Sequence, residues 1–340
     1  MSTQNHEKTI LVSGGAGYVG SVLVPKLILK GYTVKVFDTF WFWNSPEDFK
    51  KKLGLAHELK LITIKGDLRS VSDVKEAVSG VDTVIQLACI SNDPSSDLDP
   101  KFTHAINYEG NISIIDESKK AGVKRFIYAS TSSVYGIKKE QNVTEDMELE
   151  PLTQYSKLKV EVEHYLSYVF DENFKGVIIR PSTVCGYSPR LRLDLVVNIL
   201  TNSAVNQGTI KVFGGEQLRP NIHIEDMTDL YVQLVSENID KINKKIYNAG
   251  WDNLKVIEIA KLVEEVVGSV NIVVTSTDDN RSYHVSSEKI KRELGFVAKK
   301  TVKDAINDLK ISLSEGKIKN INDDRYYNVK LMKKLLNQSP

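Results

Sequence analysis

Short apolar runs alternate with amphipathic segments along the first 180 residues. Residues 9–12 form a β-branched apolar run, and in 19–29 the apolar side chains recur every three or four positions, as on one face of a helix. The same alternation continues downstream and predicts strands at 32–37, 61–64, 82–87, 125–129 and 176–180, and helices at 71–78, 105–121 and 155–170. Strands separated by helices require crossover connections, so the pattern predicts an α/β fold with a doubly wound parallel sheet.

The alternation of strand-like and helix-like segments becomes less regular after about residue 181. Shorter strand-like and helix-like segments follow at 246–248, 257–267 and 271–274. We therefore expect a first domain over 1–180 and a smaller α/β C-terminal lobe over 181–340, with some strands and helices of the second part returning to the first. Near the end, Lys330, Lys333 and Lys334 form a basic helical face, which is most simply a solvated surface helix.

Composition excludes several classes of protein. The 340 residues include 45 basic and 44 acidic side chains, for a formal charge of +1, whereas a protein drawn to nucleic acid by bulk charge usually has a marked basic excess. Cys89 and Cys185 are too few for a disulfide framework or a cysteine-rich zinc site, and we predict no metal site. The polar start and the lack of roughly 18 consecutive apolar residues favour a cytoplasmic protein without a membrane span.

A glycine-rich turn directly follows the first predicted strand and opens the first helix. Gly14, Gly17 and Gly20 are spaced three apart, which lets a dinucleotide pyrophosphate approach the backbone and the free N–H groups of the helix. Asp38 ends the second strand, where a carboxylate can accept the ribose hydroxyls of NAD and would repel the 2′-phosphate of NADP. No Arg or Lys lies between Asp38 and Asn44 to accommodate that phosphate. The alternative is a strand-end aspartate with no ligand.

Tyr155 and Lys159 are one helical turn apart and point to the same face of the predicted helix. Hydride transfer from a sugar carbinol to nicotinamide requires removal of the hydroxyl proton, and a cation beside a phenol favours the phenolate that can accept it. The alternative is an ordinary surface pair. A hydroxyl-rich segment, 130–136, leaves the carboxyl end of the fifth strand, where ligands of such sheets bind. This segment could equally be a polar turn.

Together with shorter motifs elsewhere, these residues resemble the extended short-chain dehydrogenase/reductase family, in the branch of NAD-dependent nucleotide-sugar epimerases and dehydratases. The resemblance spans nearly the whole chain and implies a Rossmann fold, NAD as cofactor and a nucleotide-diphosphate sugar as substrate. It is carried by Gly14, Gly17, Gly20, Asp38, 66–68, 87–89, Asn107, 130–136, Tyr155, Lys159, 180–183 and 218–223.

The resemblance also implies roles for individual residues, with Thr131, Tyr155 and Lys159 as the catalytic group. The cofactor would be bound by Gly14, Gly17, Tyr18, Val19, Gly20, Asp38, Asp67, Leu68, Leu87, Ala88, Cys89, Asn107, Ser130, Tyr155, Lys159, Pro181 and Ser182. The substrate would be bound by Ser91, Asn92, Thr131, Ser132, Ser133, Thr183, Asn198, Arg219 and Arg281, the last three at positions that clamp the nucleotide diphosphate. Arg190 and Arg192 are equally basic neighbours, and any of these arginines could instead form a surface salt bridge.

The chain departs from the family pattern at three places. Ser132 and Ser133 stand where related dehydratases carry an Asp-Glu pair, which argues against dehydration and decarboxylation. The loop 89–94 differs from the common small-residue version, and Thr183 replaces the usual Asn, so the sugar could be unusual. We do not expect Cys89 to be a nucleophile, because no His neighbours it in the sequence.

We expect a nucleotide-sugar 4-epimerase that works through a transient 4-keto sugar, with Tyr155 as acid and base. One alternative is a nucleotide-sugar C4 dehydrogenase or 4-ketoreductase using NAD(H), and another is a binding protein that senses NAD(H). By the resemblance we also expect a homodimer formed through the helices that contain Asn107 and Tyr155.

Overall fold

The computed structural model describes residues 8–138, 140, 142–277, 282 and 284–338, and its largest sheet has seven strands in the order β10-β6-β5-β4-β1-β2-β3. The strands are β1 (Thr9–Ser13), β2 (Thr33–Asp38), β3 (Leu61–Lys65), β4 (Thr83–Gln86), β5 (Arg125–Ala129), β6 (Lys175–Pro181) and β10 (Lys245–Ala249). From β3 to β5 the neighbouring strands pair in parallel. The chain runs outward from β1 to β3 and then returns past β1 to β4. This reversal places a topological switch point between β1 and β4, where sheets of this kind bind ligands.

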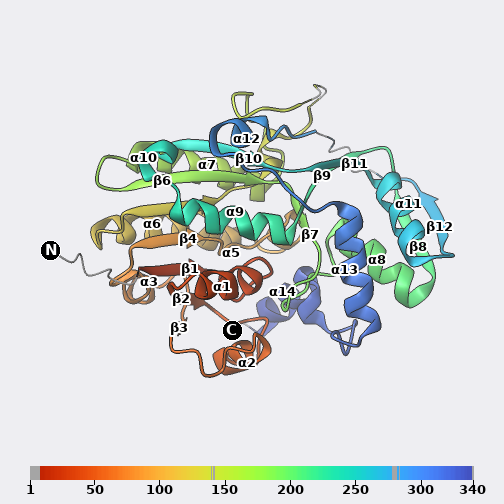
Figure 1. Cartoon of the computed structure of the whole chain (residues 1–340), viewed down its shortest axis with the longest axis horizontal. Coiled ribbons are helices and arrows are strands. Elements are labelled where there is room, and N and C mark those ends of the chain that lie inside the picture. The colour runs from red at the N-terminus through yellow and green to blue at the C-terminus, as the bar shows by residue number, and fades with distance from the viewer. Residues whose placement is uncertain (1–7, 139, 141, 278–281, 283, 339–340) are drawn as a thin grey trace. The chain divides into compact units, whose positions relative to one another are not determined.

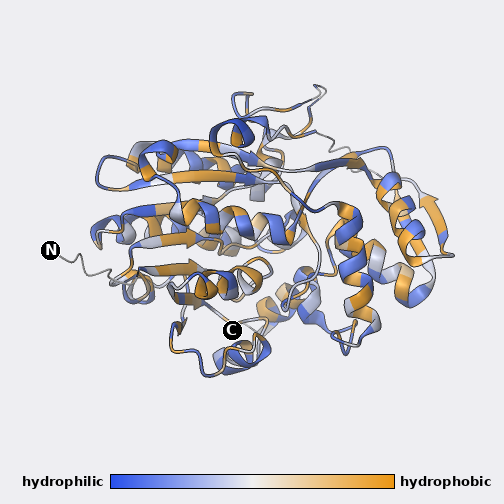
Figure 2. Ribbon diagram, viewed as in Figure 1, coloured by the Kyte–Doolittle hydropathy of each residue, from blue (hydrophilic) through white to orange (hydrophobic). Residues whose placement is uncertain are grey.

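Helices cover both faces of this sheet. Figure 1 shows α1 (Gly20–Leu29) and α9 (Ile224–Ser236) on one face, with α3 (Val71–Val78), α6 (Gly110–Lys120) and α7 (Gln154–Val169) on the other. Lys26 of α1 pairs with Asp229 of α9 at 2.6 Å, and the Tyr165 hydroxyl of α7 donates to Asp116 of α6 at 2.6 Å. Figure 2 shows apolar residues concentrated on the strands, which are buried between the helical layers.

The chain divides into two compact units that interleave in sequence. The first comprises the described residues up to Ala129, with 158–178 and 228–245, and it holds most of the large sheet. The second comprises 130–157, 179–227 and the described residues from Ile246 onward.

The second unit has two small sheets and its own core. One sheet joins β11 (Asp252–Lys255), β9 (Leu218–His223) and β7 (Thr183–Cys185), and the other pairs β12 (Asn271–Thr275) with β8 (Thr209–Phe213) in parallel. Helices α8 (Val196–Gln207), α11 (Val256–Val267) and α13 (Val302–Ser314) pack together through side chains that include Val197, Ile259, Val263 and Ile306. The amphipathic patterns of these helices account for that shared core.

The remaining helices are short or lie near the C-terminus. They are α2 (Pro46–Lys52), α4 (Asp93–Ser96), α5 (Pro100–His104), α10 (Ile239–Ile242), α12 (Glu288–Leu294), α14 (Asn328–Gln338), the π-helix η1 (Ala105–Glu109) and the 3-10 helices η2 (Ser132–Tyr135) and η3 (Asp324–Tyr326). In α14, Leu331 and Met332 are buried while Lys330, Lys333 and Lys334 are exposed. Within the described residues, no helix has the length and apolar character that crossing a membrane requires.

The structure confirms each strand and helix predicted within 9–180, with one internal difference. The helix predicted at 105–121 begins as η1 and continues as α6, and the wider π-turn coincides with side-chain bonds made there by Asn107 and Asn111. In the second part, β7, β8, β9, α8 and α13 were not predicted. Strand β9, for example, has Pro220 and Asn221 at its centre, so neither alternation nor a continuous apolar run marks it.

Candidate active site

The glycine-rich turn between β1 and α1 lies against the loop that follows β4. Gly14 has a φ of +75°, and a Cβ there would lie 2.7 Å from the backbone nitrogen of Ala88. Gly20 packs on Gly15, whose backbone a Cβ would approach to 2.5 Å. At Gly17, a Cβ would meet one described atom within 4 Å, the backbone oxygen of Gly14 at 3.1 Å. Packing requires the first and third glycines, and the second leaves the backbone open to an approaching group.

Asp38 reaches from the end of β2 to this turn. Its Oδ2 accepts the Ala16 N–H at 3.0 Å, and its Oδ1 accepts the Phe40 N–H at 2.8 Å. Tyr18 is buried and Val19 is the N-cap of α1. The structure therefore brings together the predicted cofactor residues of the turn and the predicted ribose partner.

Asp67 and Leu68 follow β3, and Asp67 is held by Arg69. The guanidinium donates from Nε to Oδ1 at 3.0 Å and from Nη2 to Oδ2 at 2.7 Å. It also lies 4.6 Å from the centre of the Phe102 ring, which stacks on Trp41 with ring centres 6.0 Å apart. Burial raises the pKa of the Asp67 carboxyl, but the hydrogen bonds from Arg69 outweigh burial and the net pKa is lowered. Asp67 is thus an oriented carboxylate at neutral pH.

The loop after β4 is fastened by the buried side chain of Asn107. The Asn107 Oδ1 accepts the Ile90 N–H at 2.7 Å, and its Nδ2 donates to the Ile90 oxygen at 3.0 Å. Asn111 continues the network, accepting from Gln86 at 3.0 Å and donating to the Asn107 oxygen at 3.1 Å. These paired amides fix the path of the half-buried residues before Ile90, which are Leu87, Ala88 and Cys89.

Ser91 and Asn92 continue this loop and are half-buried. Asn92 has a φ of 127°, and its Oδ1 accepts the Ser95 N–H at 3.0 Å to begin α4. A left-handed φ is rare at residues other than glycine, and the residues that adopt it are concentrated at functional sites.

Lys159 lies in α7 and is buried. Its Nζ donates to the backbone oxygen of Ala129, the last residue of β5, at 2.6 Å and lies 4.8 Å from the centre of the Tyr128 ring. A buried lysine is costly unless partners hold its charge, so this position has a specific role in the first unit.

Tyr155 is the second residue of α7, one turn before Lys159, and is half-buried. Thr153 and Ser156 fix this end of the helix by reciprocal bonds. The Thr153 Oγ1 accepts the Ser156 N–H at 3.3 Å, and the Ser156 Oγ accepts the Thr153 N–H at 3.2 Å. The helix that sequence spacing predicted for the Tyr155 and Lys159 pair is therefore present.

The hydroxyl-rich segment after β5 forms a capped turn. Thr131 is the N-cap of η2, and its Oγ1 accepts the Ser133 N–H at 3.1 Å. Ser132 is buried and Ser133 half-buried, while the Ser130 N–H donates to the Ile179 oxygen at 2.8 Å. The three hydroxyl residues thus lie on a rigid segment of the second unit.

A buried polar network supports this turn, and sequence reasoning missed it. The Tyr135 hydroxyl accepts from Arg180 at 2.8 Å and donates to the Asn248 Oδ1 at 2.7 Å. The Glu145 Oε1 accepts the Asn248 N–H at 2.8 Å. Burial raises the pKa of Tyr135 to about 12 and also raises the pKa of Glu145. Tyr135 is therefore a neutral hydrogen-bonding group rather than a base.

Pro181, Ser182 and Thr183 carry the chain from β6 into β7. The Ser182 N–H donates to the Ala249 oxygen at 2.8 Å, and its buried Oγ has no hydrogen-bond partner among the described atoms. Thr183 is half-buried and pairs with Asn221 in the small sheet. A buried hydroxyl of this kind can bind a ligand group.

The three residues expected at the nucleotide diphosphate have different surroundings. Asn198 is fully buried, accepting the Gly186 N–H at 3.0 Å and donating to the Arg192 oxygen at 2.8 Å. Arg219 is half-buried in β9 and donates to the Leu218 oxygen at 3.1 Å. Arg281 lies outside the described residues. Asn198 therefore organises the segment 186–192 through its amide.

The neighbouring basic residues Arg190 and Arg192 are also buried. Arg192 pairs with Asp194 at 3.0 Å, and Arg190 donates to Asn328 at the start of α14. The Asn328 N–H donates in turn to Asp194 at 3.2 Å. The C-terminal helix is thereby tied to the segment that Asn198 organises.

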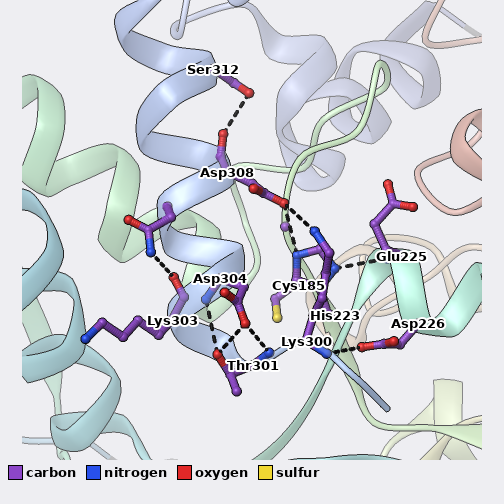
Figure 3. Close-up of polar contacts among 12 residues, drawn as sticks. Cys185, His223, Glu225, Asp226, Lys300, Thr301, Lys303, Asp304, Asp308 and Ser312 are labelled. Atoms are coloured by element: carbon purple, nitrogen blue, oxygen red, sulfur yellow. Dashed lines mark hydrogen bonds and ion pairs between the residues drawn. The ribbon is translucent and has the colours of Figure 1, made fainter. Parts of the chain in front are cut away.

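Figure 3 shows a separate polar cluster around His223 at the end of β9. The His223 Nδ1 accepts the Glu225 N–H at 3.1 Å, and its Nε2 lies 3.3 Å from the Asp308 Oδ2 of α13. Burial, together with Lys300, lowers the pKa of His223. Burial raises the pKa of the neighbouring Cys185, which is consequently no nucleophile. This cluster holds β9 against α13 inside the second unit.

No group of three or more His, Cys, Asp or Glu residues in the described part of the chain is arranged to hold a metal ion. The open turn at Gly17 and the carboxylate of Asp38 beside it instead fit a dinucleotide with free ribose hydroxyls. The buried Lys159 follows the half-buried Tyr155 by one helical turn in α7. The fold and these residues together are typical of a Rossmann-type protein that binds a dinucleotide.

Comparison with known proteins places the chain in a family. The model of the NAD dependent epimerase/dehydratase family matches residues 10–250, and the chain belongs to that family. UDP-glucose 4-epimerase 3 of Oryza sativa is 27% identical over 330 residues, covering 88% of each chain. An uncharacterized UDP-glucose epimerase of Bacillus subtilis is 30% identical over 270 residues, covering 76% of this chain and 82% of the relative.

The fold is shared with solved structures. The UDP-glucuronic acid 4-epimerase from Bacillus cereus, in complex with UDP-glucuronic acid and NAD, matches with a TM-score of 0.80 at 23% identity, covering 90% of this chain and 99% of that one. The predictions of an extended short-chain dehydrogenase/reductase, of a Rossmann fold and of NAD as cofactor are confirmed.

Proposed function

We propose that this protein is a nucleotide-sugar 4-epimerase and that its substrate is a UDP-sugar. The observation that carries the proposal is the α7 pair, a half-buried Tyr155 followed one turn later by the buried Lys159. The curated relatives reported above are named as UDP-glucose epimerases, and the solved relative as a UDP-glucuronic acid 4-epimerase, which supports the choice of UDP and of C4.

The residues of the first unit would hold the cofactor. The glycine-rich turn would bind the pyrophosphate, Asp38 the adenosine ribose, and Asp67 with Leu68 the adenine, while the loop 87–89 would line the nicotinamide end. When bound, NAD accepts a hydride from the sugar and returns it. Asn107 would act through the loop that it fastens. We propose that Ser130, Pro181 and Ser182 also bind the cofactor.

Tyr155 would remove the proton from the C4 hydroxyl and later return it, acting as base and then as acid. Lys159 follows one helical turn later, and an ammonium at that position would favour the phenolate that this role requires. Thr131 would hydrogen-bond the same reacting oxygen. The 4-keto sugar formed in this way would rotate in the site and present the other face of C4. Return of the hydride to that face would invert the configuration at C4.

Ser132 and Ser133 argue against the neighbouring reaction classes. Neither hydroxyl can act as acid or base near neutral pH, so elimination of water and decarboxylation lack their catalytic groups. We propose that these serines, with Ser91, Asn92 and Thr183, contact the sugar. Arg219 and Arg281 would bind the diphosphate, and Asn198 would support the same site by holding the segment 186–192. In this proposal most of the cofactor contacts come from 1–180, whereas the substrate contacts come from both 1–180 and 181–340.

The test is incubation of purified protein with UDP-glucose or UDP-glucuronic acid, followed by proton NMR of the sugar. Appearance of the 4-epimer at catalytic turnover without added NAD supports the proposal. Build-up of NADH in step with an oxidised sugar would identify a C4 dehydrogenase, and consumption of NADH with a 4-keto sugar would identify a ketoreductase. Tight NAD binding with no conversion of any sugar would point to an NAD(H) sensor. The homodimer through the helices that contain Asn107 and Tyr155, which are η1 with α6 and α7, is a separate proposal, which light scattering tests.

A further inference from the structure

The segment that follows Asp38 has a fixed conformation that the proposed mechanism does not use. Phe40 is buried and has a φ of 57°, in the left-handed region. Its ring meets the ring of Phe49, on α2, edge to face with centres 5.8 Å apart. The Trp43 ring meets the same Phe49 ring in the same manner at 5.3 Å. Phe49 is fully buried, so it holds both rings in place.

Trp43 also reaches the glycine-rich turn. Its indole Nε1–H donates to the backbone oxygen of Ala16 at 2.7 Å. The Ala16 N–H donates to the Asp38 Oδ2 at 3.0 Å. The two peptide groups that flank Ala16 are therefore each bound by a side chain, one by Asp38 at the end of β2 and the other by Trp43 in the segment that follows.

These two peptide groups lie between Gly15 and Gly17, and glycine restricts backbone rotation less than other residues do. The Gly17 N–H donates to the Gly14 oxygen at 3.0 Å, and the Ser21 N–H donates to the Gly17 oxygen at 3.0 Å to start α1. Rotation of the Ala16–Gly17 peptide would break the first of these bonds. A side-chain donor on the Ala16 oxygen opposes that rotation and holds the turn in one conformation before a ligand arrives.

We propose that Trp43 is a positioning residue for the dinucleotide, and that its indole N–H pre-orders the glycine-rich turn. The inference rests on the proposed placement of the NAD pyrophosphate at this turn. It assigns part of the cofactor affinity to a hydrogen bond from a residue that does not need to touch the cofactor. Loss of one such bond corresponds to a roughly two- to tenfold rise in the Kd for NAD.

Two variants separate the hydrogen bond from the packing. Trp43→Phe keeps an aromatic ring against Phe49 and loses the N–H, while replacement of Trp43 by 3-benzothienyl-alanine exchanges only the N–H for sulfur. Calorimetry on nucleotide-free protein measures the Kd for NAD and, separately, the Kd for UDP. We expect both variants to bind NAD about two- to tenfold more weakly, with unchanged UDP affinity. Trp251→Phe, at a 44% exposed tryptophan of the second unit, is the matched control and should bind NAD normally.

An unchanged Kd for NAD in the benzothienyl variant would overturn the inference and leave the proposed function standing. Equal weakening of NAD and UDP binding would also overturn it, because general loss of packing would explain both. If the parent protein binds no NAD, the proposed function itself fails. The benzothienyl variant preserves shape and volume, so the question can be answered even if Trp43→Phe folds poorly.

Discussion

The ammonium of Lys159 and the backbone oxygen of Ala129 are 2.6 Å apart, so one side chain joins the middle of α7 to the last residue of β5. Ala129 immediately precedes the segment that carries Thr131. A lysine first noted for its spacing from Tyr155 is therefore also a fixed point of the first unit. Its proposed catalytic role and its structural role can be separated by measurement.

Lys159→Met keeps most of the side-chain volume and removes the charge. We expect turnover to fall by about 10²-fold or more, because the phenolate of Tyr155 loses its neighbouring cation. The Ala129 oxygen also loses its donor, which should lower the free energy of unfolding by about 1–3 kcal/mol. Steady-state kinetics and urea unfolding measure the two effects. Lys157→Met, at an exposed lysine of the same helix, should change neither, and parental turnover in Lys159→Met would contradict the mechanism.

Tyr155→Phe removes one oxygen from a half-buried ring. We expect turnover to fall by about 10²–10⁴-fold, the usual contribution of a positioned acid–base group, with the melting temperature and NAD content nearly unchanged. Tyr168→Phe provides the control, because Tyr168 lies on the same helix and is 85% exposed. Thr131→Val should lower turnover less than Tyr155→Phe does. Epimerisation by Tyr155→Phe at the parental rate would remove Tyr155 from the mechanism.

Asp38→Asn tests the choice of cofactor. The amide keeps one acceptor oxygen but loses the charge that repels a 2′-phosphate, so the preference for NAD over NADP should narrow by about tenfold, or ~1.4 kcal/mol. Titrations with both dinucleotides measure the ratio. Because the carboxylate also accepts from Ala16 and Phe40, a modest loss of stability should accompany the change. A parent protein that binds both dinucleotides equally would show that Asp38 does not read the ribose.

Tyr135→Phe probes the network behind the Thr131 turn. The change leaves buried groups of Arg180 and Asn248 without the tyrosine hydroxyl, and we expect a loss of about 1–3 kcal/mol in the free energy of unfolding. Turnover should fall less than in Tyr155→Phe, since Tyr135 acts through position alone. Chemical denaturation checks the first expectation. Stability equal to that of the parent would mean that the network contributes nothing net.

The contact between Asp171 and Lys119, in the first unit, should be sensitive to acid. The hydrogen bond from Lys119 and two backbone N–H donors lower the pKa of Asp171 from 3.8 to about 2. A carboxyl whose pKa is depressed by folding stabilises the protein above its unfolded pKa, and that stability is lost as pH falls through the folded pKa. The melting temperature of Asp171→Asn should therefore lie below that of the parent at neutral pH. The difference should close between about pH 4 and pH 2, and a constant difference across that range would contradict the assignment.

Sequence patterns predicted the features that depend on residues close together in the chain, such as the glycine-rich turn, the strand end at Asp38 and the helix of Tyr155. Gly14, Asp38 and the Tyr155 spacing were recognisable because turn, strand end and helix each need a specific residue at a specific offset. The Tyr135 to Asn248 bond was not predictable in this way, since it joins residues 113 positions apart and leaves no periodic trace. The same holds for the bonds between the Asn107 amide, in η1, and the backbone of Ile90, in the loop after β4.

Apart from β12, the strands of the small sheets in the second unit were not predicted, for a related reason. Strand β9 has Pro220 and Asn221 at its centre, so neither alternation nor a continuous apolar run marks it. Arg180 was predicted as the end of a strand and as part of a family motif, but its bonds to Tyr135 and to the Glu145 oxygen join segments that no sequence pattern relates.

The interleaving of the two units has a consequence for biosynthesis. The first unit needs 158–178 and 228–245 as well as the described residues up to Ala129, so a nascent chain cannot finish it until about residue 245 has left the ribosome. By then the segments 130–157 and 179–227 of the second unit have also emerged. In many proteins the N-terminal domain folds before the next domain is synthesised. This chain cannot follow that order, because its first unit is completed only after parts of the second have been made. A single proteolytic cut or a simple truncation cannot release either unit intact.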